Sequence, residues 1–123
     1  MTDAPPSTIL LLSSDLATSS KVAGAAARQG AKLEVALDAA ALVEKAATLL
    51  PKLVILDLST PRTDVAAVVR EFTAKIPIRP AIIAFGPHVH EGLLAAARTA
   101  GCDRVLSRGQ FHAQVDELLS AVT

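Results

Sequence analysis

The stretch LVILDLSTP, residues 53–61, is an unbroken apolar run that ends in an aspartate, Asp57, followed by a turn with a proline. The run does not alternate with polar residues, which is typical of a strand that helices cover on both faces, as in a parallel sheet. A carboxylate at the end of a buried strand needs polar partners, because an unpaired charge in apolar surroundings is costly. The rest of the chain is therefore expected to supply both covering helices and polar groups for Asp57.

Four more short apolar runs and five Ala-rich stretches surround this segment and alternate along the chain. The expected strands are Thr8–Leu12, Lys32–Ala36, Leu53–Leu58, Ala81–Phe85 and Asp103–Leu106. The expected helices are Asp15–Gln29, Ala39–Leu50, Asp64–Lys75, His88–Ala100 and Gln110–Val122. Start and stop signals support these bounds: Ser13 or Ser14 is expected to cap the first helix, and helix ends are marked by Gly30, Pro51 and Gly101.

Five strands that alternate with five helices predict a single α/β domain over residues 8–123, with residues 1–7 as a polar, flexible lead-in. Parallel strands need right-handed crossovers, and each connecting segment is long enough to form one. We therefore expect a doubly wound, five-stranded parallel sheet of the flavodoxin-like type, with strand order 2-1-3-4-5. Binding sites in such sheets lie at the carboxyl ends of the strands, near the point where the strand order reverses.

The composition argues against several function classes. Lys plus Arg and Asp plus Glu number 12 each, so the formal net charge is zero and no basic surface for nucleic acid or an anionic membrane is expected. The apolar stretch Ile9–Leu12 is too short for a signal peptide or a membrane span, and we expect a cytoplasmic protein. Cys102 is the only cysteine, which excludes an intramolecular disulfide. His88 and His90 would point to different faces of a helix, so no zinc site is expected.

Residues 57–61, with Asp64 after them, resemble the phosphoacceptor segment of the receiver domain of bacterial response regulators. Ile9–Leu12 is similar to the first strand of that family, and residues 101–103 are similar to its turn before the fifth strand. The resemblance covers residues 8–122. It implies a receiver fold and a role in signal transduction, in which the aspartate that ends the third strand is the phosphoacceptor of a two-component phosphorelay.

Four parts of the family's phosphorylation site are replaced in this chain. The acidic pair that holds a magnesium ion together with the acceptor aspartate falls on Ser13 and Ser14. The Ser or Thr that contacts the phosphoryl group falls on Phe85, and the Lys that precedes a proline falls on Arg108. The aromatic switch position, three residues before that Lys, falls on Val105.

These replacements predict a site without metal-assisted phosphorylation. Mg²⁺ is usually held by one or two carboxylates with phosphate oxygens, whereas two of the family's acidic positions are hydroxyls here. Phosphoryl transfer needs neutralisation of charge, so Asp57 is expected to be a poor acceptor. We predict that Asp57 instead accepts a hydrogen bond from Ser13 or Ser14 and pairs with Arg108. The degenerate pocket is expected to comprise Ser13, Ser14, Asp15, Ser59, Phe85, Val105, Ser107 and Arg108.

The favoured interpretation is a non-enzymatic pseudo-receiver without a cofactor, which binds a partner protein or a second copy of itself. The resemblance implies a binding surface formed by the fourth helix, fifth strand and fifth helix, with the residues His90, Arg98, Arg104, Gln114 and Glu117. One alternative is a receiver that a histidine kinase phosphorylates on Asp57 with the help of Mg²⁺. Another is a domain that binds a small anion at a rim formed by Ser13, Ser14, Ser107 and Arg108.

Overall fold

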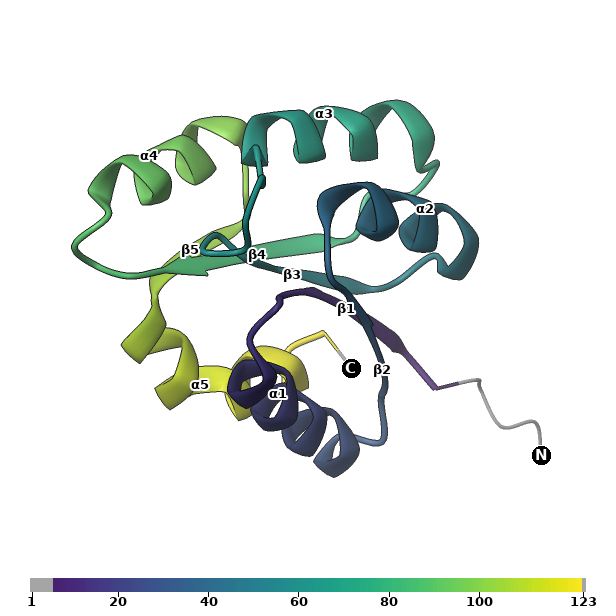
Figure 1. Cartoon of the computed structure of the whole chain (residues 1–123). Coiled ribbons are helices and arrows are strands. Elements are labelled where there is room, and N and C mark those ends of the chain that lie inside the picture. Colours follow the sequence, from purple (N-terminus) through teal and green to yellow (C-terminus); the bar gives the residue numbers. More distant parts are fainter. Residues whose placement is uncertain (1–5, 123) are drawn as a thin grey trace.

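Strands form at the short apolar runs and helices form at the Ala-rich stretches (Figure 1). The computed structural model describes residues 6–122, so residues 1–5 of the expected lead-in and Thr123 lie outside the described residues. The strands are β1 (Thr8–Leu12), β2 (Lys32–Ala36), β3 (Leu53–Asp57), β4 (Ala81–Gly86) and β5 (Arg104–Ser107). The helices are α1 (Leu16–Arg28), α2 (Ala39–Leu49), α3 (Val65–Lys75), α4 (Glu91–Ala100) and α5 (Arg108–Ser120).

The strands pair in the order β2-β1-β3-β4-β5, and all four pairings are parallel. The predicted doubly wound, flavodoxin-like sheet is confirmed. Helices α1 and α5 cover one face of the sheet, and α2, α3 and α4 cover the other (Figure 1). The chain runs from β1 outward to β2 and then returns to β3 on the other side of β1, so the loops after β1 and β3 leave from adjacent strand ends.

Alternate strand residues supply two separate apolar layers. Leu10 of β1 packs with the buried side chains of α2, α3 and α4, whereas the preceding residue, Ile9, packs with those of α1 and α5. The largest side chain of the first layer is Phe72, and the largest of the second are Phe85 and Phe111. Complete burial of an apolar side chain of this size contributes about 1.5–3 kcal/mol. Every residue of β3 is buried, as its unbroken apolar run predicts.

The start of α1 differs from the expected one. Asp15 occupies the N-cap position and the helix begins at Leu16, so the prediction that Ser13 or Ser14 caps this helix is wrong. The reason is tertiary, because the hydroxyl of Ser13 donates to the carboxylate of Asp57 at 2.8 Å and does not reach the helix interior. Asp15 itself accepts from the hydroxyl of Thr18 in the first turn.

The start of α4 is also later than expected. The predicted start was His88, but residues 87–90 form a turn in which His90 N donates to Pro87 O at 2.9 Å, and the helix begins at Glu91. The predicted end is confirmed, since Gly101 has a left-handed backbone with φ of 96°. Among the described residues, no helix is both long and apolar enough to cross a membrane.

The start of α5 is earlier than expected, at Arg108 instead of Gln110. The hydroxyl of Ser107 accepts from Gln110 N at 3.2 Å, and the side chain of Gln110 accepts from Ser107 N at 2.9 Å. This reciprocal pair of hydrogen bonds is a capping box, which the sequence analysis did not predict. As a consequence, Arg108 is the first residue of α5, and its side chain projects from a helix instead of from a loop.

Candidate functional site

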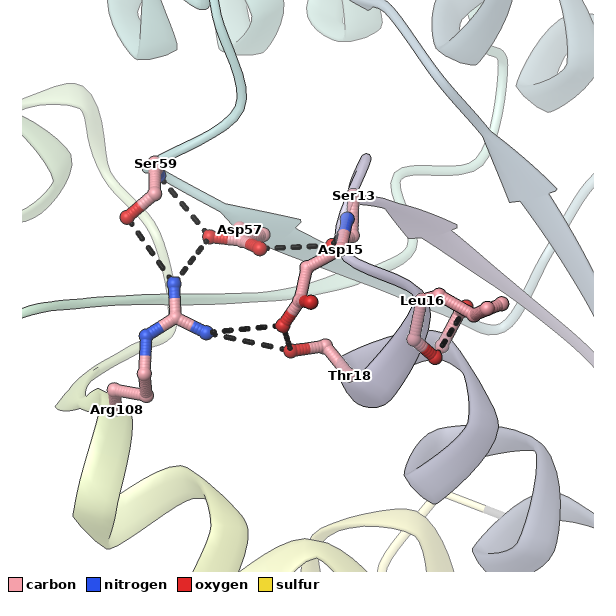
Figure 2. A network of polar contacts seen from close by, with 8 residues as sticks. Ser13, Asp15, Leu16, Thr18, Asp57, Ser59 and Arg108 are labelled. Atoms are coloured by element: carbon pink, nitrogen blue, oxygen red, sulfur yellow. Dashed lines mark hydrogen bonds and ion pairs between the residues drawn. The ribbon is translucent and has the colours of Figure 1, made fainter.

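Three chain segments meet at the carboxyl edge of the sheet and bring Ser13, Asp57 and Arg108 together (Figure 2). Ser13 follows the last residue of β1, Asp57 is the last residue of β3, and Arg108 follows β5. Strands β1 and β3 are neighbours at the point where the strand order reverses, which is where sites form in doubly wound sheets. The predicted meeting of these loops is confirmed.

Asp57 is a buried carboxylate with donors on both oxygens. Only 2% of its surface is exposed. Its Oδ2 accepts from Ser13 Oγ at 2.8 Å, and its Oδ1 accepts from Ser59 N at 3.0 Å and from Nη2 of Arg108 at 3.2 Å. Hydrogen bonds to a carboxylate are stronger than those between neutral groups, so these three donors replace the water that Asp57 loses on burial. The predicted hydrogen bond from Ser13 and the predicted pair with Arg108 are both confirmed.

The guanidinium of Arg108 bridges two sides of the site. Its Nη2 also donates to Ser59 Oγ at 3.1 Å. Its Nη1 donates to Thr18 Oγ1 at 3.3 Å and lies 3.8 Å from Asp15 Oδ2. Figure 2 shows the side chain reaching from α5 between the loop after β3 and the first turn of α1. The guanidinium of Arg108 on α5 thus contacts the ends of two further elements, β3 and α1.

Thr18 is the site residue that the sequence reasoning missed. It is completely buried, donates to Asp15 Oδ2 at 2.6 Å and accepts from Arg108. The available signal was its position three residues after Asp15, because residues at that spacing are neighbours on a helix. The hydrogen bond from Thr18, with backbone donors and the charge of Arg108, outweighs desolvation and holds the pKa of Asp15 below its ordinary value.

An aromatic stack forms the floor of the site. The ring of Phe85 is completely buried, and the guanidinium carbon of Arg108 lies 5.3 Å from its centroid. Phe111 stacks on Phe85 with ring centroids 4.2 Å apart, and His112 meets both rings edge-on. Desolvation lowers the pKa of His112, and the charges of Lys21 and Arg108 lower it further, against two nearby carboxylates. Phe85 occupies the position that the resemblance assigns to a phosphoryl-contacting hydroxyl.

Three predicted pocket residues do not join this cluster. Ser14 is exposed, and only its neighbour Ser13 contacts Asp57. The hydroxyl of Ser107 is used in the capping box of α5. Val105 packs against the apolar layer beneath α2, α3 and α4, on the opposite face of the sheet from Phe85.

The cluster does not suit a divalent cation. Such an ion is held by several oxygen ligands, usually including one or two carboxylates, in a geometry that is octahedral for Mg²⁺. Both oxygens of Asp57 already have donors, and the other carboxylate at the edge, that of Asp15, pairs with Arg108. Within residues 6–122, no group of three or more His, Cys, Asp or Glu side chains is placed to hold a metal ion. His88 and His90 are exposed, and Cys102 is half-buried.

The side chains at this edge are also poorly placed to bind a small anion. Of the four residues of the predicted rim, Ser107 is engaged by the helix cap and Arg108 by two carboxylates. The carboxylates of Asp15 and Asp57 would repel an incoming anion at short range. Ser13 donates its hydroxyl proton to Asp57. The available positive charge is therefore balanced within the protein.

Comparison with known proteins identifies the fold of the chain but no family. No family model and no curated protein matches the chain. Solved structures do match it, with a TM-score of 0.82 for the receiver domain of a response regulator from Bermanella marisrubri, at 23% identity over 96% of this chain and 98% of that one. The chain has the receiver-domain fold. The receiver domain of NtrX from Brucella abortus matches with a TM-score of 0.73, at 21% identity over 94% of this chain and 99% of that one.

A further structure with the same fold contains a metal ion. The receiver domain of a sensor histidine kinase from Pseudomonas aeruginosa matches with a TM-score of 0.81, at 19% identity over 96% of this chain and 98% of that one. That domain has a magnesium ion coordinated in its active-site cleft. The present chain has the same fold, and the carboxyl edge of its sheet holds the guanidinium of Arg108 between two carboxylates.

Proposed function

We propose that this chain is a receiver-type signalling module that works by binding a partner protein, without metal-dependent phosphorylation of Asp57. The observation that carries the proposal is the state of Asp57. Its two oxygens have three donors from the chain itself, and one of these donors is the cation Arg108. A receiver fold with its acceptor already neutralised retains the surfaces of a signalling domain but not the chemistry of phosphoryl transfer.

The chemical argument concerns developing charge. In phosphoryl transfer, metal ions and positioned cations neutralise the oxygens of the transferring group while the nucleophile stays free to attack. Here the cation neutralises the nucleophile, and Phe85 presents an apolar ring at the place where a hydroxyl is expected. Asp57 is therefore a structural acceptor of hydrogen bonds rather than a nucleophile.

The surface formed by α4, β5 and α5 is the proposed contact face. His90, Arg98, Arg104 and Glu117 are exposed on it, and Gln114 is half-buried. Mixed charges of this kind support a polar, reversible interface with a partner protein or a second copy of the chain. Charge reversal at Arg98 and Arg104 together is expected to weaken such an association, which sedimentation over a wide concentration range measures for the self-association case.

Treatment with a small phosphodonor tests the proposal. The wild type is incubated with acetyl phosphate at millimolar Mg²⁺, and its intact mass is recorded over time, with Asp57→Ala as the control. No mass gain specific to Asp57 is expected. A gain of one phosphoryl group that disappears in Asp57→Ala would instead support the alternative of an atypical receiver that a histidine kinase phosphorylates.

A further inference from the structure

We propose that Arg108 is a built-in counter-cation, which takes the place of a divalent metal ion at the sheet edge and excludes such an ion from it. The inference rests on the proposed function, because it explains how the fold keeps a buried carboxylate without a metal. It goes further by assigning to one side chain the selectivity of the site against divalent cations.

The first argument is the set of oxygens around the guanidinium. Two terminal nitrogens of Arg108 contact four side-chain oxygens at 3.1–3.8 Å, and two of those oxygens belong to carboxylates. The contacts come from the residues Asp15, Thr18, Asp57 and Ser59. A metal ion also gathers oxygens from several loops at one point. The two cations differ in the ligands they prefer. A guanidinium donates hydrogen bonds, which hydroxyl oxygens accept well, whereas a divalent metal ion favours carboxylate oxygens.

The second argument is the apolar floor. The guanidinium lies 5.3 Å from the centroid of Phe85, and that ring is held in place by its stack on Phe111. A guanidinium is weakly hydrated and binds well over an aromatic face. Mg²⁺ keeps several of its water ligands, which need polar neighbours, and an aromatic ring offers none. The ring of Phe85 therefore favours the guanidinium of Arg108 over a hydrated magnesium ion.

The third argument is charge. Asp57 and Asp15 supply two negative charges, and Arg108 supplies one positive charge between them. A divalent cation would have to approach a guanidinium that is held by Asp15, Thr18, Asp57 and Ser59. Repulsion between the two cations opposes binding as long as Arg108 stays in place.

The test separates the lost carboxylates from the added cation. One variant carries Ser13→Asp and Ser14→Asp with Arg108 retained, and a second carries the same changes together with Arg108→Gln, which removes the cation. Their affinities for Mg²⁺ and Mn²⁺ are measured by calorimetric titration, beside the wild type. We expect no binding by the wild type and at least about tenfold tighter binding by the triple variant than by the double variant, because a fixed guanidinium adds repulsion close to the ion.

Equal affinity of the double and triple variants would overturn the inference, as would metal binding by the wild type. If the triple variant does not fold, the single change Arg108→Gln replaces it, with Arg70→Gln on the exposed surface of α3 as the matched control. A rise in melting temperature with Mg²⁺ that is larger for Arg108→Gln than for both the wild type and the control is expected. A rise no larger than theirs would refute the role of Arg108, whereas the phosphodonor experiment alone decides the proposed function.

Discussion

The pairing of Asp57 with Arg108 joins a nearly inaccessible carboxylate to a partly exposed cation. The side chain of Asp57 is 2% exposed and that of Arg108 is 32% exposed. In such a pair, loss of the cation leaves a buried charge without its strongest partner, which costs more than the pair itself contributes. The remaining donors to Asp57, Ser13 Oγ and Ser59 N, are neutral.

Charge reversal at Arg108 tests the strength of this pair. Arg108→Glu is expected to lower the free energy of unfolding by about 2–4 kcal/mol, because it leaves Asp57 beside a like charge. Part of the loss is offset, since an acidic residue at the start of α5 interacts favourably with the helix dipole. Urea denaturation measures the change. The matched control Arg70→Glu, on an exposed helix surface, is expected to stay within about 0.5 kcal/mol of the wild type, and an equal loss in both variants would refute the pair.

The thiol of Cys102 gives a second prediction at the scale of one residue. Burial raises the pKa of this thiol to about 11, although the charge of Arg79 opposes the shift. Because the thiolate is the reactive form, alkylation by iodoacetamide at pH 8 is expected to be at least about tenfold slower in the folded protein than in urea. Equal rates in the two conditions would show that the thiol is accessible and ordinary.

At the scale of elements, capping side chains and glycines determine where the helices begin and end. Asp38 and Asp64 cap α2 and α3 by accepting from backbone N–H groups, at 2.8 Å and 3.2 Å respectively. The capping box of α5 matters most for the site, because it fixes the start of the helix and with it the backbone position of Arg108. A helix end formed by glycine works through the backbone alone, and α4 allows such an end, Gly101, to be compared with a glycine inside the helix, Gly92.

Substitution by alanine at two glycines of α4 is expected to have opposite effects. Gly101 has φ of 96° and an added Cβ would meet no atom within 4 Å, so the cost of Gly101→Ala is backbone strain of about 1 kcal/mol. Gly92 lies within the helix and an added Cβ would also meet no atom within 4 Å, so Gly92→Ala is expected to stabilise by about 0.5–1 kcal/mol. Thermal unfolding of both variants measures the changes, and shifts of the same sign would contradict this account.

At the scale of the molecule, the response to acid combines groups from both edges of the sheet. Near the site, the pKa values of His112 and Asp15 are lowered. At the opposite edge, burial raises the pKa of Asp103, but hydrogen bonds from Ile82 N and Arg79 outweigh it, and the net shift is downward. A group whose pKa is lower in the folded state contributes stability above its unfolded pKa and loses it as the pH falls through the folded value.

Stability is therefore expected to fall in two stages as the pH is lowered. The first stage begins below 6.5, the ordinary pKa of histidine, as His112 takes up a proton near Lys21 and Arg108. The second begins below 3.8, the ordinary value for the two aspartates with lowered pKa. Melting temperatures from pH 8 to pH 3 measure both stages. His112→Gln is expected to remove the first stage and keep the second, and persistence of the first stage in this variant, or its loss in His88→Gln, would refute the assignment.

The order of elements and the strand at residues 53–57 followed from local pattern, because an apolar run without alternation and well-placed glycines and prolines act over a few residues. The convergence of Ser13, Asp57 and Arg108 followed from the known geometry of doubly wound sheets. The role of Thr18 did not follow, since it rests on a hydrogen bond with Arg108, 90 residues away along the chain. Contacts between distant segments form only when the sheet assembles and brings the loops after its strands together. That packing determines that the hydroxyl of Ser107 caps a helix while the hydroxyl of Ser13 donates to the carboxylate of Asp57.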